Sequence, residues 1–268
     1  MKTFKDMLIQ KLEHYLKIEK ILNRIKTPDV KGHISIRNKG NPQYYHCIRN
    51  PVTNELERNY VDASNLQLAK QVASNQYYLK LRRIVNKRLK QILSILRDYE
   101  ENEVDLVYEK YSIEKRRLFT PIQPTYAIKL ESWKTEKYTG LGFSITQNKI
   151  ITKKGEMVRS KSEKILADTF FDFGIEYKYE CPLQLKNNVT IYPDFTFLHP
   201  LNHDEIYWEH FGMMDDPTYA TKAIKKIGLY ENNGIFRTER LIFSFEYSNR
   251  ALDPHWVETI INQYGLKV

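Results

Sequence analysis

Hydrophobic residues near the start of the chain recur at helical spacing. Leu8, Leu12 and Leu16 fall on one stripe, and lysines occupy much of the remaining surface. This pattern is typical of an amphipathic helix, in which residues three and four apart share a face. We therefore expect a helix over residues 3–26.

The pattern then changes to an alternation with a period of two. Ile34 and Ile36 alternate with polar residues, a polar turn follows at Asn38–Asn41, and hydrophobic residues return directly after it. Alternation on both sides of an Asn/Gly turn predicts a β-hairpin. A further short strand is expected near residues 58–61, so this β segment covers about residues 32–61.

Helical spacing resumes at residue 65 and continues to about residue 117. Val85, Leu89, Ile92 and Leu96 are separated by alternating steps of four and three. Such spacing forms a packing seam, suited to a helical hairpin or to a short coiled coil between two copies of the chain. A homodimer through this helical region is one expectation that follows.

Two prolines between residues 119 and 124 interrupt the helical pattern and predict a boundary near residue 120. The chain is thus expected to form a helical region with a hairpin over residues 1–120 and a second domain over residues 121–268. In the second domain the order of elements predicts a mixed sheet with helices on its faces, an α/β (α+β) fold. Ser162 is the expected N-cap of a helix that runs to residue 173. The other expected elements are strands at 176–185, 189–198 and 204–211, a helix at 217–233, a strand at 235–247 and a helix at 253–264.

Charge separates the two halves of the sequence. The chain carries a net charge of +9, and its first 120 residues contain 24 basic and 14 acidic residues, so all of the basic excess lies in the first half. A basic half attracts phosphate backbones through counterion release, although the same charge also suits anionic membranes or simple solubility. Nucleic acid is therefore a candidate partner.

Composition excludes several other classes of protein. With 41% hydrophobic and 28% charged residues, the chain is typical of a globular protein. No apolar run is long enough to span a membrane, and the charged N-terminus does not resemble a secretory signal. Cys47 and Cys181 lie far apart and form no ligand cluster, so a reducing, cytoplasmic location is expected.

Basic residues gather on the long helix expected after residue 65. One interpretation is a solvated face with its own salt bridges, and the other is a helix that lies along a nucleic-acid backbone. The candidate contacts of the second interpretation are Arg82, Arg83, Lys87 and Arg88.

Two acidic residues on consecutive strands carry the candidate chemistry. Asp194 and Glu209 are expected on adjacent antiparallel strands, because the loop between the strands is short. Two carboxylates that meet on a sheet repel each other, and a divalent cation relieves this repulsion. Oxygen ligands select Mg²⁺ or Mn²⁺, and such a metal polarises a phosphoryl oxygen and activates water. Glu163 could add a ligand, and Lys226 could orient water or neutralise charge near the phosphate.

Each of these residues also has an ordinary structural interpretation. Glu163 would complement a helix dipole, and the lysines near residue 225 would form a solvated helix face. His210 should point away from Glu209, because neighbouring strand residues face opposite ways, and a buried structural histidine is expected there. Lys222, Lys226 and Tyr230 share one helix face by their spacing of four. No spaced set of Cys and His supports a zinc site.

The sequence resembles the PD-(D/E)XK nuclease superfamily. The resemblance rests on an acid in the first helix of an αβββαβ order, on Pro193-Asp194 and on Glu209, and it covers about residues 155–250. The chain departs from the usual acid-any-lysine motif, since Phe211 occupies the lysine position. The segment Lys226–Tyr230 is similar to the helix motif of RecB-like nucleases, and the segments 155–163 and 208–212 are similar to those of uncharacterised bacterial members.

The resemblance implies a restriction-endonuclease-like core and metal binding by Asp194 and Glu209, supported by Glu163. It also implies supporting catalytic roles for Lys226 and Tyr230. We expect a Mg²⁺-dependent nuclease that acts on DNA more readily than on RNA. Its phosphate contacts would come from Arg159, Lys161 and Lys222.

Two alternatives remain open at this point. The first is a nucleic-acid-binding protein on a degenerate nuclease fold that lacks activity because of Phe211. The second is an effector whose helical region is recruited by a protein partner. In either nucleic-acid interpretation, the basic N-terminal region binds the substrate or joins two copies of the chain.

Overall fold

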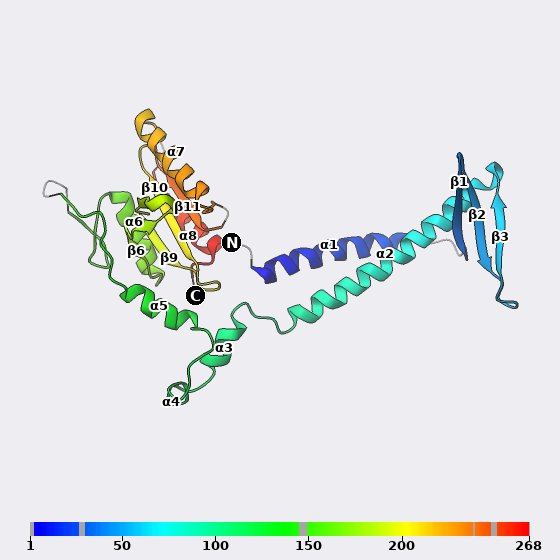
Figure 1. The fold of residues 1–268 in the computed structure, drawn as a ribbon, viewed down its shortest axis with the longest axis horizontal. Coiled ribbons are helices and arrows are strands. Elements are labelled where there is room, and N and C mark those ends of the chain that lie inside the picture. Colours follow the sequence, from blue (N-terminus) through cyan, green and yellow to red (C-terminus); the bar gives the residue numbers. More distant parts are fainter. Residues whose placement is uncertain (1–2, 27–29, 145–148, 238, 248–250, 268) are drawn as a thin grey trace. The chain divides into compact units, whose positions relative to one another are not determined.

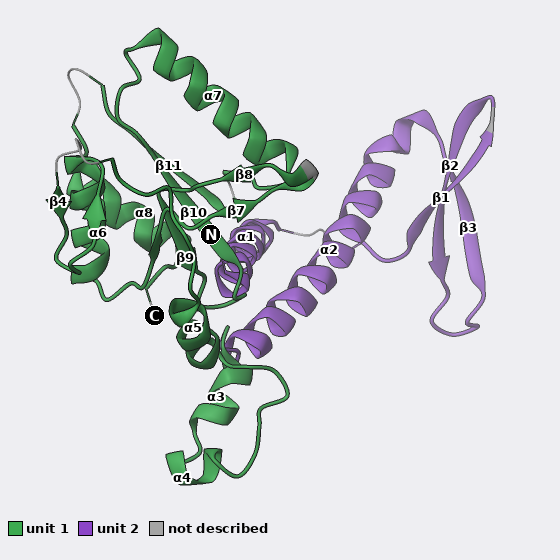
Figure 2. Ribbon diagram, turned by 60° about the vertical axis from the view of Figure 1, so that its left-hand side comes forward, with its two compact units in different colours: residues 1–2, 101–268 green, residues 3–100 purple. Residues whose placement is uncertain are grey.

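The computed structural model describes residues 3–26, 30–144, 149–237, 239–247 and 251–267 (Figure 1). The chain divides into two compact units, one of residues Thr3–Glu100 and one that begins at Glu101 (Figure 2). The boundary expected near residue 120 therefore lies inside the second unit. Residues 101–120 contact the rest of this unit. For example, the Asp105 carboxylate accepts a hydrogen bond of 2.7 Å from the backbone N–H of Tyr126.

Two antiparallel helices form the body of the N-terminal unit. Helix α1 covers Phe4–Arg24 and helix α2 covers Leu66–Leu96. Leu22 of α1 is buried together with Val85 and Leu89 of α2, so the predicted seam is the packing surface of a helical hairpin within one chain. The prediction of a helical hairpin is confirmed, and the homodimer stays a prediction.

A three-stranded antiparallel sheet lies between these helices in the sequence (Figure 1). Gly40 makes the tight turn of the predicted hairpin with a φ of +85°, a conformation that glycine adopts without steric cost. The strands are β1 (His33–Lys39), β2 (Asn41–Arg49) and β3 (Leu56–Val61), and a short 3₁₀ helix, η1 (Ala63–Asn65), leads into α2.

The second unit is built around a mixed four-stranded sheet with the order β11-β10-β9-β6. Strands β10 and β11 run parallel, and β10–β9 and β9–β6 run antiparallel. Two small two-stranded sheets, β4–β5 and β7–β8, accompany it. The strands are β4 (Ile150–Ile151), β5 (Met157–Val158), β6 (Lys178–Tyr179), β7 (Leu183–Gln184), β8 (Thr190–Ile191), β9 (Phe195–Leu198), β10 (Glu205–Phe211) and β11 (Leu241–Phe245).

Helices pack on both faces of this mixed sheet. On one face, α6 and α8 bury Phe170 and Ile261 against Trp208 of β10. On the other face, α7 buries Tyr230 against Tyr207 of β10. The mixed α/β class predicted from the sequence is confirmed. The helices of this unit are α3 (Glu103–Glu109), α4 (Ile113–Arg116), α5 (Tyr126–Thr135), α6 (Lys161–Asp172), the 3₁₀ helix η2 (Lys186–Asn188), α7 (Pro217–Asn232) and α8 (Pro254–Tyr264).

Four local expectations were wrong. The strand expected over 176–185 is broken into β6 and β7, which belong to different sheets. The N-cap of α6 is Ser160 and not Ser162, because the Ser160 hydroxyl accepts the backbone N–H of Glu163. The strand expected over 189–198 is broken into β8 and β9 around Pro193, which has no N–H to donate to a ladder. The strand expected over 235–247 is only the five residues of β11. Within the described residues, no helix has the length and apolar character needed to cross a bilayer.

Phe170 provides a test of the core of this unit. It contacts the rings of Phe195, Phe197 and Trp208 at centroid distances between 4.9 and 5.3 Å. Phe170→Ala should lower the free energy of unfolding by about 3–5 kcal/mol, through lost burial and an unfilled cavity. Denaturant unfolding followed by tryptophan fluorescence reports this unit selectively, because all three tryptophans lie in it.

The neighbouring Phe171 is the matched control, because its side chain is 49% exposed. Phe171→Ala should change the unfolding free energy by less than about 1 kcal/mol. Equal losses in the two variants would contradict the placement of α6 on the sheet.

Candidate active site

The acids at positions 194 and 209 lie beside each other at the end of β9. Strands β9 and β10 are antiparallel neighbours, and Phe195 is paired with Trp208. Asp194 directly precedes β9, and its Oδ2 accepts a 2.6 Å hydrogen bond from the backbone N–H of His210. The expected adjacency of the two strands is thus confirmed, although Asp194 stands in the break before its strand.

The Glu209 carboxylate is almost completely buried, with the residue only 1% exposed, and each of its oxygens meets a side chain of α7. Lys226 Nζ lies 2.7 Å from Oε2 and also donates to the carbonyl oxygen of Tyr192 at 2.9 Å. The hydroxyl of Tyr230 donates to Oε1. Lys226 and Tyr230 are four residues apart, so a single helix face presents both groups to the sheet.

Burial raises the pKa of the Glu209 carboxyl, and the neighbouring Lys226 ammonium only partly offsets this. Burial and the Glu209 charge together raise the pKa of Asp194 well above its usual range, against the opposing effect of Lys226. For Lys226 itself, burial acts to lower the pKa, but Glu209 and Asp194 outweigh it and the pKa is raised. Two carboxylates that resist ionisation thus share one ammonium group.

Glu163 lies in the first turn of α6, as expected. Its Oε2 accepts hydrogen bonds from the backbone N–H of Arg159 at 2.9 Å and from the Tyr179 hydroxyl at 2.6 Å, and its Oε1 accepts from the Ser160 hydroxyl at 2.9 Å. These contacts cap the helix. The same carboxylate also raises the pKa values of Asp194 and Glu209, although it is the smallest of the influences on each. Capping and proximity to the acidic pair therefore coexist.

A divalent cation suits the donors of this cluster. Mg²⁺ is commonly held by one or two carboxylates and keeps several waters, and two mutually repelling carboxylates gain from its charge. No group of three or more His, Cys, Asp or Glu side chains is close enough to form a metal cage in the part of the chain that the structure describes. Asp194 and Glu209 could hold such an ion as a pair. Glu163, which the sequence predicted as a third ligand, does not form a three-ligand group with them among the described residues, and both of its oxygens are bonded to Ser160, Tyr179 and the N–H of Arg159.

The residues expected to bind phosphate differ in their surroundings. Arg159 forms an ion pair with Glu180, donates to the carbonyl oxygen of Gly142 at 2.6 Å and lies over the ring of Phe143, so its guanidinium is already engaged. Lys161 and Lys222 are exposed. Lys222 lies one turn before Lys226 on α7.

The basic residues of α2 belong to the N-terminal unit. Arg82 donates to the backbone carbonyl of Leu22 at 2.7 Å and so ties α2 to α1. Arg88 donates to Gln91, whereas Arg83 and Lys87 are exposed on the helix surface. The nucleic-acid interpretation of this helix stays a prediction.

His210 points away from Glu209, as its strand position predicts. Its ring bonds to Ser244 Oγ at 2.9 Å and to Glu246 Oε2 at 3.2 Å, which confirms the expected structural role. The Ser162 hydroxyl donates to the same Glu246 carboxylate.

Phe211, at the position where a lysine was expected, is buried against Phe243 and Phe245 with ring centroids 5.6 Å apart in each pair. A charged side chain would not fit this apolar cluster. Lys226 instead brings an ammonium to Glu209 from the facing helix.

Two tyrosines near the site were missed by sequence reasoning. Tyr179 holds Glu163, as described above. Tyr219 accepts a long hydrogen bond of 3.4 Å from the N–H of Gly212, and burial, with further contributions from Asp194 and Glu209, raises its pKa. Tyr219 precedes Lys226 by seven residues, two helical turns, and this spacing was the available signal. Tyr179 carries no comparable signal.

Comparison with known proteins gives little further information. No protein-family model and no solved structure matches the chain. An uncharacterised protein of Methanocaldococcus jannaschii is 37% identical over 91 residues, which cover 34% of this chain and 8% of that protein. The chain thus matches less than a tenth of the length of this relative.

Asp194→Asn should make the metal-free protein more stable at neutral pH. A carboxyl with a raised pKa binds its proton more tightly when folded, so stability falls as pH rises from the unfolded pKa towards the folded one. The amide removes this loss and keeps an acceptor for the N–H of His210. Tryptophan-monitored unfolding in EDTA should show a gain of about 1 kcal/mol at pH 7.5.

The gain should disappear below the usual pKa of an aspartate, where the carboxyl is protonated in both states of the wild type. A loss of stability at pH 7.5, or a gain of equal size at every pH, would contradict a raised pKa of Asp194 in the folded protein.

Proposed function

We propose that this chain is a metal-dependent nuclease that hydrolyses phosphodiester bonds of DNA. The observation that carries the proposal is the buried pair of Asp194 and Glu209 on adjacent strands, in which Lys226 bonds to Glu209 and its charge also acts on Asp194. Burying two acids side by side is costly, and a cluster of strongly perturbed groups is characteristic of a functional site. A divalent ion and a phosphate together would satisfy the charges of all three side chains.

The order of elements supports a restriction-endonuclease-like core. Helix α6, strands β6, β9 and β10, helix α7 and strand β11 follow the predicted αβββαβ sequence, on a mixed sheet covered by helices. Glu163 lies on the first helix, Asp194 directly before β9, Glu209 within β10 and Lys226 on the following helix. The proposal therefore rests on an arrangement of four elements and not on a short motif.

In this proposal each side chain has a role. Asp194 and Glu209 hold Mg²⁺ or Mn²⁺, and such an ion polarises phosphoryl oxygens and makes bound water more acidic. Lys226 neutralises charge on the phosphate or orients the attacking water. Tyr230 keeps the Glu209 carboxylate in one orientation through its hydroxyl. The exposed Lys161 and Lys222 are placed to contact phosphates.

One observation favours an inactive alternative. The ammonium of Lys226 forms an ion pair with Glu209, and position 211 carries a buried phenylalanine in place of a lysine. A nucleic-acid-binding protein on the same fold would then use the site as a structural ion pair. Metal-dependent catalysis distinguishes the two proposals.

Cleavage assays provide the test. Wild-type protein should cut single- or double-stranded DNA in Mg²⁺ or Mn²⁺ and lose activity in EDTA, whereas Asp194→Ala and Glu209→Gln should lower the rate at least about a hundredfold, as loss of a metal ligand does. Lys226→Ala should lower it to a similar extent. Lys225→Ala, at an exposed position of the same helix on a different face from Lys226, should retain most of the rate.

Equal cleavage by wild type and Asp194→Ala would mean that a contaminant or another site is responsible. Binding of DNA with no cleavage in either metal would favour the inactive protein. If Lys226→Ala alone retained full activity, the metal ligands would stand and the role of the lysine would be wrong.

A further inference from the structure

The sheet of the N-terminal unit has two unlike faces. Successive residues of a strand point to opposite sides, so Ile34, His46 and Val61 share one face. His46 and Val61 are buried on this face, and helix α2 contacts both β1 and β2. This inner face therefore packs towards the helical hairpin. On the opposite, outer face, Cys47 is buried, and the other described side chains are exposed or half-buried.

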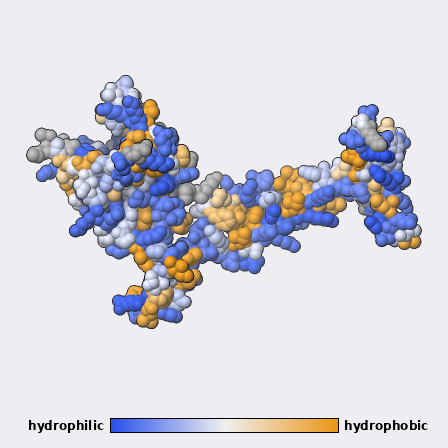
Figure 3. All heavy atoms as spheres, viewed as in Figure 1, coloured by the Kyte–Doolittle hydropathy of each residue, from blue (hydrophilic) through white to orange (hydrophobic). Residues whose placement is uncertain are grey.

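Aromatic and basic side chains occupy the outer face. Ser35, Tyr45 and Tyr60 are aligned across the three strands, and Arg37 is aligned with Gln43 one step further along. Tyr60 is 60% exposed, and Arg37 and Gln43 are exposed. Figure 3 shows the visible side of this sheet as mainly hydrophilic.

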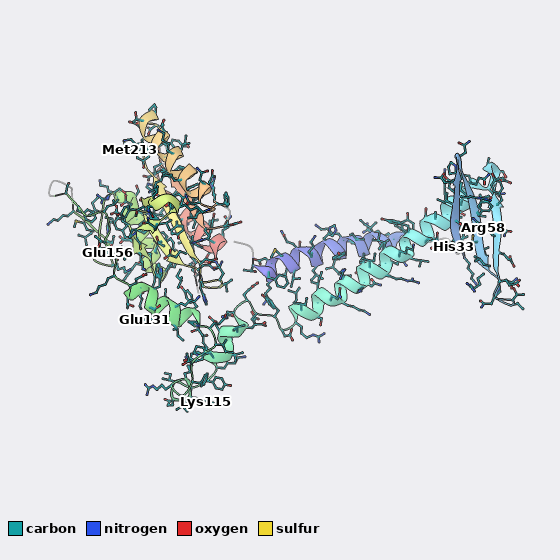
Figure 4. The ribbon with its side chains drawn as sticks, viewed as in Figure 1. His33, Arg58, Lys115, Glu131, Glu156 and Met213 are labelled. Atoms are coloured by element: carbon teal, nitrogen blue, oxygen red, sulfur yellow. The ribbon has the colours of Figure 1, made fainter. Side chains whose placement is uncertain are left out.

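Contacts within the outer face hold these groups in place. The Arg58 guanidinium lies 4.4 Å from the centre of the Tyr45 ring and donates to Ser35 Oγ at 3.2 Å. The rings of Tyr45 and Tyr60 meet edge to face at 5.6 Å. His33 and Arg58 project from the first and third strands (Figure 4). The Arg58 guanidinium and the exposed Tyr60 ring are thus both held against the ring of Tyr45.

The charge of this face is uniformly positive. Its strand positions carry Arg37, Arg49 and Arg58, and none carries Asp or Glu in the described part of the sheet; Glu57 belongs to the inner face by its pairing with Ile48. The whole N-terminal unit holds 19 basic and 9 acidic residues, which accounts for the basic excess of the chain. The face therefore complements a polyanion.

We infer that the outer face of β1–β2–β3 binds single-stranded DNA. Stacking surfaces interleaved with cations recognise unpaired bases and their phosphates, because every base has a π-face and every linkage a negative charge. Tyr60 and the Arg58 plane would stack with bases, while Arg37 would contact the backbone. The bases of a duplex are stacked on one another, so a duplex would contact this face only through its phosphates. The inference assigns a second surface, beyond the proposed cleavage site, and does not depend on cleavage.

Fluorescence anisotropy with a labelled thymidine oligomer of about thirty nucleotides tests this inference on the full-length chain. The buffer contains EDTA, so binding is measured without cleavage and a failure of the nuclease proposal leaves the result interpretable. Tyr60→Ala should weaken binding about tenfold, whereas Tyr60→Phe should bind as wild type, because stacking needs the ring and not the hydroxyl. Arg37→Glu should weaken binding and reduce the slope of log K against log salt by about one or more.

Asn59→Ala is the matched control, because Asn59 lies between Arg58 and Tyr60 but faces the other side of the sheet. It should bind as wild type. Unchanged circular dichroism of each variant shows that the sheet still forms. If Tyr60→Ala does not fold, Arg37→Glu still tests the inference, because Arg37 is exposed and its substitution leaves the core intact.

Wild-type affinity in both Tyr60→Ala and Arg37→Glu would overturn the inference. So would tighter binding to the duplex of the same sequence than to the single strand, or tighter binding to the corresponding RNA. Equal loss in Asn59→Ala and Tyr60→Ala would also overturn it, because the effect would then not belong to one face.

Discussion

The burial of the Glu209 carboxylate is the constraint on which the second unit depends. A carboxylate that is 1% exposed needs a counter-charge and hydrogen-bond donors, and both come from α7 through Lys226 and Tyr230. The position of α7 on the sheet is therefore tied to this acid as well as to apolar packing. Asp194, next to it, adds a second negative charge that one lysine cannot balance.

The remaining packing keeps this arrangement in place. On one face of the sheet, Phe170 and its aromatic neighbours fix β9 and β10 side by side, which sets the spacing of the two acids. On the other face, Phe211 extends the apolar layer under α7 and leaves that helix to supply the ammonium. A stable core thus holds a locally unfavourable cluster, as expected where structure supports a function.

Much of this could be predicted from the sequence, and the failures have physical reasons. Periodicity located the helices, the hairpin around Gly40 and the antiparallel neighbours that carry Asp194 and Glu209. It could not choose between Ser160 and Ser162 as a cap, because both precede the same acid. It also overlooked the break that Pro193 makes in its strand.

Long-range pairing was the other limit. Nothing local indicates that Arg159 pairs with Glu180, or that Tyr179 holds Glu163, because these partners are 16 to 21 residues apart and meet only in the folded unit. The division of the chain near residue 100 likewise involves contacts such as the one between Asp105 and Tyr126. The charge split was visible in the sequence, but the face of the sheet on which Tyr60 and Arg58 meet needed the strand register.

Calorimetric titration of Mn²⁺ into the wild type and into Glu209→Gln tests the central claim most directly. The account predicts binding by the wild type with release of protons at mildly acidic pH, because metal displaces protons from carboxyls whose pKa values are raised. Proton release is measured by repeating the titration in buffers of different ionisation enthalpy. Glu209→Gln should bind at least about tenfold more weakly. No binding by the wild type at millimolar Mn²⁺, or equal binding by both proteins, would contradict the account.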